Sequence, residues 1–361
     1  MMNKISWWRT NFGDDEIEHV VHSIRNKNIS QGPVTKEFEK SLSDYLEIKH
    51  VIAVSNGSSA ILIALMAVGI QPGDEVIIPN RTWIATAHAV HLLGAKVILV
   101  DTEENRPIID ASLIEEKVNS KTKAIIPVHM NGRSCDMSKI KEIANKNNLF
   151  VIEDAAQAIA SRNSYGYLGT QSDIGCFSLS VAKTISTGQG GFAVTDDDLL
   201  ANKIRAIRTH GVENVKEPKE WLMPGFNFRF TDISASIGIE QLKKLPERIK
   251  NLRHIYEVYE RNLKDSPFQI IPVDLKSGEI PVYNEFLVKN RERWEEKLAD
   301  SEIETRSFYP SINSAHYIGQ AKEKFINSEL FSKNGIYLPS GPDQKILSIK
   351  EVIRAINNII L

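Results

Sequence analysis

The sequence predicts an α/β protein with a large domain, built on a mostly parallel sheet of the seven-stranded type covered by helices, and a smaller C-terminal α/β domain. Short apolar runs alternate with segments of helical periodicity, which indicates β-α-β units. A length of 361 residues favours one large and one smaller domain. We place the large domain at residues 1–245 and the small domain at 246–361, with the N-terminal segment free to pack on the small domain.

The first elements are predicted to be helices. Ile17, Val20, Val21 and Ile24 recur at helical spacing, so we expect a helix over residues 14–27. A loop over 28–32 follows, and Pro33 suits the first turn of a second helix, which we expect to end at residue 46.

Strands and helices then alternate. Predicted strands cover 51–54, 73–79, 96–100, 124–128, 149–152, 174–179 and 192–194. Predicted helices cover 61–68, 83–93, 112–118 and 137–146, and another starts within 195–198 and ends at 208. This order argues for a mostly parallel sheet with helices on both faces.

The C-terminal third contains a loop and the smaller domain. Residues 213–224 are polar, include Pro218 and Pro224, and are predicted to form a loop. A long helical pattern enters at residue 232 and continues to about residue 263, with a break at Pro246. In the small domain we expect strands at 269–272 and 282–288, and helices at 291–299 and 348–360.

Composition excludes several classes of partner. Lys and Arg number 44 against 46 Asp and Glu, so no basic surface for a nucleic acid is indicated. Cys135 and Cys176 do not have a metal-binding spacing, and we expect no metal. No apolar run approaches the ~20 residues of a membrane span, and the N-terminus has no signal-peptide core. We therefore expect a cytoplasmic protein without a membrane partner.

One stretch of the chain carries the residues expected to do chemistry. The strand at 149–152 leads into Glu153 and Asp154, at the strand edge where open α/β sheets bind ligands. Lys183 lies between two strand-like runs and has apolar neighbours, which favours a desolvated amine over an ordinary surface lysine. A nucleophilic amine and an acid able to hold a pyridinium nitrogen are two groups that pyridoxal phosphate chemistry requires.

Two further positions have both a structural and a ligand-binding interpretation. The segment Ser55-Asn-Gly-Ser-Ser-Ala60 joins a strand to a helix. It is either a simple helix cap or a phosphate site that uses free backbone N–H groups. Trp83 follows a predicted strand, where it either packs in the core or stacks on a flat cofactor.

Several motifs in one order give the chain a family resemblance. From residue 29 to 241, and more weakly to the C-terminus, it resembles the DegT/StrS family of pyridoxal-phosphate-dependent sugar aminotransferases, which has the aspartate-aminotransferase fold (fold type I). The motifs are Ile29-Ser-Gln-Gly-Pro-Val-Thr-Lys-Glu-Phe-Glu39, Ser55-Asn-Gly-Ser-Ser-Ala60, Val128-His-Met-Asn-Gly132, Glu153-Asp-Ala-Ala-Gln157, Phe177-Ser178 with Lys183, Gly188-Gln-Gly-Gly191, and Gly225-Phe-Asn-Phe-Arg229 before Gln241-Leu242.

The resemblance implies roles for individual residues. Lys183 matches the catalytic Schiff-base lysine, and Asp154 matches the acid paired with the pyridine nitrogen. The other implied cofactor contacts are Gln157 at the ring hydroxyl or ring face, Gly57, Ser58 and Ser178 at the phosphate, and Trp83 stacked on the ring. Asn227 matches a phosphate contact from a neighbouring subunit, which implies a homodimer with shared active sites. Arg229, in the same motif, and the aromatic Tyr309 are candidates for substrate binding.

The resemblance also implies an activity: transfer of an amino group from L-glutamate to a keto sugar, foremost a nucleotide-linked 4-keto-6-deoxy sugar used in polysaccharide or glycan biosynthesis. A 3-keto nucleotide sugar and a small phosphorylated ketone stay open as acceptors. Ser180 stands where the family often has His or Tyr, and Pro310-Ser311-Ile312 replaces a family Pro-Leu-His.

Two other functions are weighed against this activity. The family's dehydratase branch has histidine in place of the lysine, so Lys183 argues against it. A pyridoxal-phosphate-binding regulator without turnover is the alternative from another class. DNA-binding regulators of this fold carry an added helix-turn-helix domain, for which the N-terminal segment is too short.

Overall fold

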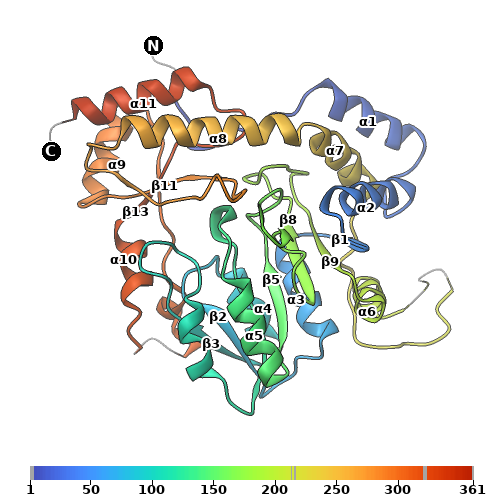
Figure 1. Cartoon of the computed structure of the whole chain (residues 1–361). Helices are drawn as coiled ribbons and strands as arrows, with labels where there is room; N and C mark the ends of the chain where they lie inside the picture. The colour runs from blue at the N-terminus through green and yellow to red at the C-terminus, as the bar shows by residue number, and fades with distance from the viewer. Residues whose placement is uncertain (1–3, 213, 215–216, 320–322, 360–361) are drawn as a thin grey trace.

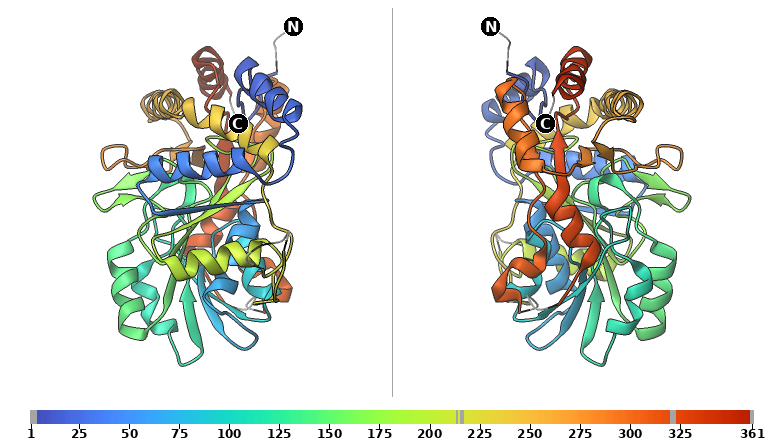
Figure 2. Two further views of the ribbon diagram at one scale, coloured as in Figure 1. Left: turned by 90° about the vertical axis from the view of Figure 1, so that its right-hand side faces the viewer. Right: turned by 90° about the vertical axis from the view of Figure 1, so that its left-hand side faces the viewer.

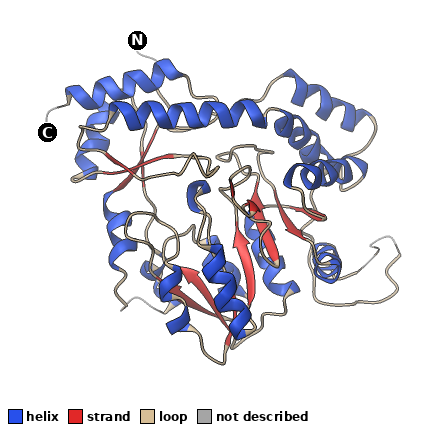
Figure 3. Cartoon of the chain, in the orientation of Figure 1, coloured by secondary structure: helices blue, strands red, loops and turns tan. Residues whose placement is uncertain are grey.

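The computed structural model describes residues 4–212, 214, 217–319 and 323–359. It contains a large sheet and a smaller one. In the view of Figures 1 and 3, the large sheet lies below the smaller one. None of the helices in these ranges is long and apolar enough to cross a membrane.

The large sheet has the predicted seven strands. Their order is β1-β9-β8-β5-β4-β2-β3, and only β9 runs antiparallel to its neighbours. The carboxyl ends of the other six strands therefore share one edge. The strands are β1 (His50–Val54), β2 (Glu75–Pro79), β3 (Lys96–Val100), β4 (Thr122–Ile125), β5 (Phe150–Asp154), β8 (Ile174–Ser178) and β9 (Gly191–Thr195).

Helices cover both faces of this sheet, as the side views in Figure 2 show. Alternate residues of β1 supply the two cores: Ile52 and Val54 pack on one side, Val51 and Ala53 on the other. The first side is covered by α3 (Gly57–Ala67), α4 (Ala85–Leu92) and α6 (Asp198–Arg208). The second is covered by α2 (Pro33–Leu46), α5 (Met137–Asn147) and α7 (Asp232–Lys243), with α1 (Asp14–Arg25) packed on α7.

The smaller sheet is antiparallel, in the order β10-β11-β13-β12. Its strands are β10 (Gln269–Ile270), β11 (Asn284–Leu287), β12 (Arg306–Ser307) and β13 (Gly335–Leu338). The associated helices are α8 (Leu245–Asn262), α9 (Arg291–Asp300), α10 (Ile326–Asn334) and α11 (Ile346–Asn358), and α8 and α11 lie side by side (Figure 1). Ile5 and Trp8 of the N-terminal segment form bridges to Ile303 and Ser340. The domain boundary at residue 245 stays a prediction.

Some predicted elements were wrong or missing. The helix expected at 112–118 is two short 3-10 turns, Ala111–Leu113 and Glu115–Lys117, because its bonds run from residue i+3 to residue i. Further 3-10 turns occur at Met130–Gly132, Ile312–Ser314 and His316–Ile318. The pattern did not reveal β12, β13, α10 or the hairpin of β6 (Arg162–Asn163) and β7 (Gly166–Tyr167). The loop residues Glu213, Val215 and Lys216 and the helix residue Ile360 lie outside the described ranges.

Candidate active site

A cavity of about 600 Å³ lies where the carboxyl edge of the large sheet meets the smaller sheet. Residues that follow β1, β2, β5 and β8 line one side of it, and Tyr283, Arg306 and Tyr337 line the other. Of the predicted site residues, the cavity brings together Gly57, Ser58, Trp83, Asp154, Gln157, Ser178, Lys183 and Tyr309.

Lys183 lies on the loop that joins β8 to β9, at the wall of the cavity. Burial lowers the pKa of Lys183 to about 8, although the nearby Asp154 carboxylate opposes this shift. A larger fraction of this amine is therefore neutral near pH 7 than of an ordinary lysine. It has the character of a nucleophile or proton acceptor, as the sequence predicts.

The peptide around Lys183 is held by donors from other elements. Trp8 Nε1 donates to the carbonyl of Val181 at 3.1 Å, and the Tyr283 hydroxyl donates to that of Ala182 at 2.6 Å. Two residues are thus fixed next to the amine, by one side chain from the N-terminal segment and one from the residue that precedes β11. The loop is braced rather than free.

Asp154 ends β5 and is 4% exposed. Its Oδ2 accepts a hydrogen bond from Thr86 Oγ1 at 2.8 Å, and its Oδ1 accepts one from the Ala156 N–H at 3.1 Å. Burial raises the pKa of Asp154, whereas Thr86, Ala156 and Lys183 lower it. The carboxylate therefore depends on its donors to hold a negative charge in this cavity.

Glu153, the other acid of the pair, has a structural role. Its carboxylate is fully buried, lies 2.8 Å from His129 Nε2, and accepts bonds from Gly169 N, Gln171 N and Ser172 Oγ. Burial alone would raise the pKa of Glu153, but these contacts, led by the one with His129, lower it. Glu153 does not line the cavity in the described ranges, so only Asp154 faces a ligand there.

The first turn of α3 forms one end of the cavity. Asn56 caps this helix by accepting a bond from Ser59 N at 2.8 Å, which leaves the N–H groups of Gly57 and Ser58 near the cavity. A Cβ at Gly57 would lie 2.8 Å from Ser178 Cβ, so glycine is needed for the close approach of α3 to β8. Hydroxyl and N–H groups at a helix N-terminus can hold a phosphate.

Aromatic and amide groups complete the wall. Trp83 is 58% exposed, which is high for a tryptophan, and its ring meets Tyr309 edge-on at 5.5 Å. Of the two interpretations of Trp83, a free ring face favours stacking over core packing. Gln157 Oε1 accepts a bond from Asn131 N at 2.9 Å, which fixes its side chain at the cavity.

Two predicted site residues lie elsewhere in the single chain. Asn227 is exposed, and Arg229 Nε donates to Asn227 Oδ1 at 3.0 Å; neither residue lines the cavity among the described ranges. Of the two unusual positions, Ser180 does line the cavity, whereas the Ile312 side chain is buried in the core of the large sheet. Ile312 therefore cannot contact a substrate directly.

Thr86 and Tyr283 line the cavity but were not predicted as site residues. Thr86 could have been found, because it follows Trp83 by three residues, which is close to one helical turn, and lies in the first turn of α4. Tyr283 lies 100 residues from Lys183 along the chain, and no local pattern connects the two.

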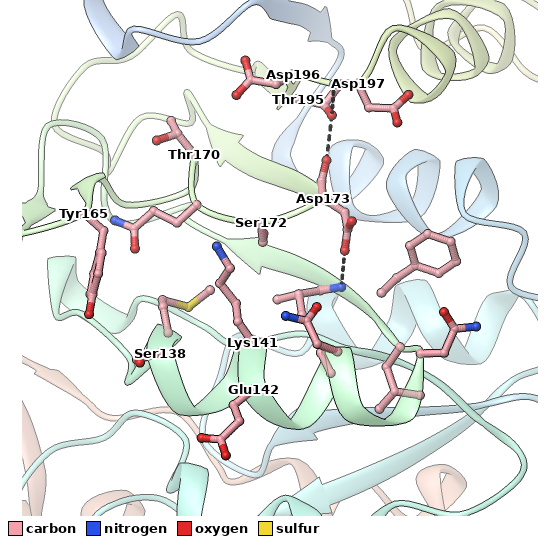
Figure 4. A pocket seen from close by; sticks show the side chains of 18 residues that line it. Ser138, Lys141, Glu142, Tyr165, Thr170, Ser172, Asp173, Thr195, Asp196 and Asp197 are labelled. Atoms are coloured by element: carbon pink, nitrogen blue, oxygen red, sulfur yellow. Dashed lines mark hydrogen bonds between the residues drawn. The ribbon is translucent and has the colours of Figure 1, made fainter.

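A larger cavity, of about 1110 Å³, lies at the opposite edge of the sheet (Figure 4). Its polar groups have structural roles. Asp173 Oδ2 accepts from Val151 N at 2.7 Å, Thr195 Oγ1 donates to the Asp173 carbonyl at 2.7 Å, and Asp197 caps α6. The one lysine among the described residues that line this cavity, Lys141, is exposed, unlike the desolvated Lys183 beside Asp154.

Comparisons with known proteins identify relatives of the whole chain. The curated relatives include proteins named GDP-perosamine synthase. The one from Caulobacter vibrioides is 35% identical over 357 residues, with 96% of each chain covered, and the one from Escherichia coli O157:H7 is 35% identical over 331 residues, covering 90% of this chain and 88% of the relative. A solved structure of E. coli GDP-4-keto-6-deoxy-D-mannose-3-dehydratase with bound hydrated PLP has a TM-score of 0.90 at 25% identity, covering 99% of this chain and all of that one.

The residues of the cavity fit pyridoxal 5′-phosphate, the cofactor of this enzyme. Lys183 would supply the amine, Asp154 an acid for the ring nitrogen, Trp83 a flat ring face, and the first turn of α3 with Ser178 a phosphate site. The fold is that of the fold type I aminotransferases, as predicted. The model of the DegT/DnrJ/EryC1/StrS aminotransferase family matches residues 11–357, and the chain therefore belongs to this family.

Proposed function

We propose that this pyridoxal-phosphate-dependent transaminase moves an amino group from L-glutamate to a nucleotide-linked 4-keto-6-deoxy sugar, as a cytoplasmic homodimer. The observation that carries the proposal is the placement of the Lys183 amine and the Asp154 carboxylate in one cavity that also has room for a large substrate. The names of the relatives, which give a GDP-linked amino sugar as product, support the class of acceptor.

Lys183 and Asp154 have different roles in the proposed reaction. Bound pyridoxal phosphate supplies an electron sink for the carbon that loses its proton. Lys183 Nζ, with its lowered pKa, accepts a proton from the substrate and returns it as a general acid. Asp154 would keep the ring nitrogen of the cofactor protonated, and the braced loop of Lys183 would keep the amine in position.

The homodimer is supported by the position of Asn227. It lies on an exposed segment that also presents Trp221, 75% exposed, and Phe226, 68% exposed. Exposed aromatic residues grouped on one segment are typical of a surface that another protein covers. A second copy of the chain seated there would bring Asn227 to its partner's cavity.

The acceptor is tested by direct assay. Purified protein is incubated with L-glutamate and each of a panel of ketones, and 2-oxoglutarate release is measured. We expect turnover with one or more nucleotide-linked 4-keto-6-deoxy sugars. Turnover only with a 3-keto nucleotide sugar or a small keto-phosphate would show that the acceptor is that compound instead. A protein that binds the cofactor but turns over no amino donor would be a regulator.

A further inference from the structure

Arg306 is the one basic residue besides Lys183 among the described residues that line the cavity. It lies on β12 of the smaller sheet, paired with Tyr337 of β13, and its side chain is exposed. The only acid lining the described cavity is Asp154, which already has donors of its own. Arg306 therefore brings a positive charge to the cavity that no carboxylate in the described ranges neutralises through an ion pair.

The side chain of Arg306 packs against the ring of Trp7. Its guanidinium lies 4.4 Å from the centre of the Trp7 ring. Trp7 is itself fixed: its N–H donates to Glu304 Oε2 at 3.3 Å, its carbonyl accepts from Ser340 N at 2.7 Å, and its ring stacks on Tyr283 at 6.0 Å. A guanidinium placed over an aromatic face keeps its N–H edge free for an anion.

The other candidate cations are placed differently. Arg81 is 1% exposed and lies between the rings of Phe308 and Tyr309, with Nη1 bonded to the Tyr309 carbonyl. Arg229 lies beside Asn227 and away from the cavity of its own chain. Of these three arginines, Arg306 is thus the one placed to meet a substrate anion that enters beside Trp7.

We propose that Arg306, supported by Trp7, binds an anionic oxygen group of a substrate in the cavity, and this inference rests on the proposed function. Two sources share this chemistry: the diphosphate of a nucleotide-linked sugar and a carboxylate of the amino donor. A guanidinium can hold either through two parallel N–H···O bonds. Lysine at this position would keep the charge but would lose the planar fork and much of the stacking on Trp7.

The test compares Arg306→Met, Arg306→Lys and Trp7→Leu with wild type and with Arg293→Met. Arg293 lies on α9, is exposed and does not line the cavity, so its variant removes the same type of charge outside the site. Circular dichroism and the absorbance of the bound cofactor establish that each variant is folded and loaded.

Two measurements distinguish binding of the nucleotide diphosphate from binding of the donor carboxylate. Calorimetric titration with GDP, UDP and dTDP measures nucleoside diphosphate binding without turnover. Stopped-flow absorbance with L-glutamate alone measures the half-saturating donor concentration. If Arg306 binds the diphosphate, Arg306→Met weakens nucleotide binding about tenfold or more, Arg306→Lys and Trp7→Leu weaken it less, and the glutamate arm is unchanged. If it binds the donor carboxylate, the same order appears in the glutamate arm.

Unchanged values in both arms, or an equal effect of Arg293→Met, would overturn the inference and leave Arg306 as a solvated surface charge. Such a result would leave the proposed function intact. Wild-type protein that neither binds a nucleoside diphosphate nor reacts with glutamate would overturn the proposed function and this inference together.

Discussion

Lys183 is the residue whose chemistry the cavity changes most directly. Burial lowers its pKa to about 8, so the amine becomes neutral as pH rises through that value rather than through 10.5. Since the neutral amine is the nucleophile, the rate at which apo-protein takes up pyridoxal phosphate should rise with pH and level off above about 8. Stopped-flow absorbance measures this rate.

The control for this prediction is Lys183→Ala. This variant should bind the cofactor through the remaining contacts and show no turnover. Borohydride treatment should attach the cofactor covalently to the peptide containing Lys183 in wild type, and should attach none in the variant. A rate that keeps rising to the ordinary lysine value of 10.5, or a label on another lysine, would contradict the assignment.

Thr86 is expected to set the charge of Asp154. Its hydroxyl lies 2.8 Å from Asp154 Oδ2 and 3.2 Å from the Trp83 carbonyl, so the shorter contact is to the carboxylate. Thr86→Val removes a hydrogen bond to a charged group, worth about 1.5–3 kcal/mol, and should therefore raise the pKa of Asp154 still further. The acidic limb of the kcat profile should then move to higher pH, because Asp154 is protonated sooner as pH falls. Thr86→Ser keeps the hydroxyl and serves as the control; an acidic limb that stays in place in Thr86→Val would show that Thr86 acts only in packing.

At the residue scale, sequence reasoning located the groups whose neighbours in the chain reveal them. Lys183 has apolar neighbours and Asp154 ends a buried strand, and the structure places both at one cavity. Tyr283 was not predicted because its role comes from a contact across the fold, in which its hydroxyl donates to the Ala182 carbonyl. Such contacts leave no periodic signal along the sequence.

At the scale of elements, the contact between α3 and β8 shapes the predicted phosphate site. A Cβ added to Gly57 would lie 2.8 Å from Ser178 Cβ and 3.3 Å from Ser178 Cα, too close for either element to remain in place. Gly57→Ala should therefore displace the first turn of α3 and weaken pyridoxal phosphate binding about tenfold or more, with a smaller loss of thermal stability. Fluorescence titration of the apo-protein measures the affinity.

Gly13→Ala is the matched control for Gly57→Ala. A Cβ there would meet only the ends of the Glu16 and Lys244 side chains, both at 3.9 Å, so cofactor affinity should stay at the wild-type value. An unchanged affinity in Gly57→Ala would mean that the first turn of α3 does not contact the phosphate.

The order of elements was predictable where apolar runs are long and clearly bounded, as in all seven strands of the large sheet. The antiparallel direction of β9 could not be predicted, because the apolar content of a strand does not encode its direction. The smaller sheet was harder, since β10 and β12 have two residues each and obtain their pairing from β11 and β13. The segment 112–118 formed 3-10 turns because each of its two pieces is too short to nucleate an α-helix.

At the scale of the whole molecule, the cavity exists only because distant segments meet. The N-terminal segment forms bridges, through Ile5 and Trp8, to residues that flank β12 and β13 of the smaller sheet. Trp8 and Tyr283 then donate hydrogen bonds to carbonyls next to Lys183. The part of the chain that carries the amine and the part that covers it are therefore stabilised together. Sequence periodicity predicted two α/β units but not how they close on each other.

Assembly leads to the last prediction, because Asn227 does not line the cavity of its own chain in the described ranges and is proposed to reach that of a partner. Lys183→Ala and Asn227→Ala should each be inactive or nearly so. When the two variants exchange subunits, each mixed dimer has one site with Lys183 from one chain and Asn227 from the other. Random exchange of equal amounts should restore about a quarter of the wild-type sites, measured as 2-oxoglutarate release.

The matched control mixes Lys183→Ala with Asp154→Ala. These two residues line one cavity of the same chain, so every site of a mixed dimer carries one of the two substitutions and no activity should return. Native mass spectrometry of differently tagged chains establishes that exchange has occurred. If exchange is complete and the Lys183→Ala and Asn227→Ala pair recovers nothing while both variants still bind the cofactor, each active site is built within one chain, and the exposed segment around Asn227 has another role.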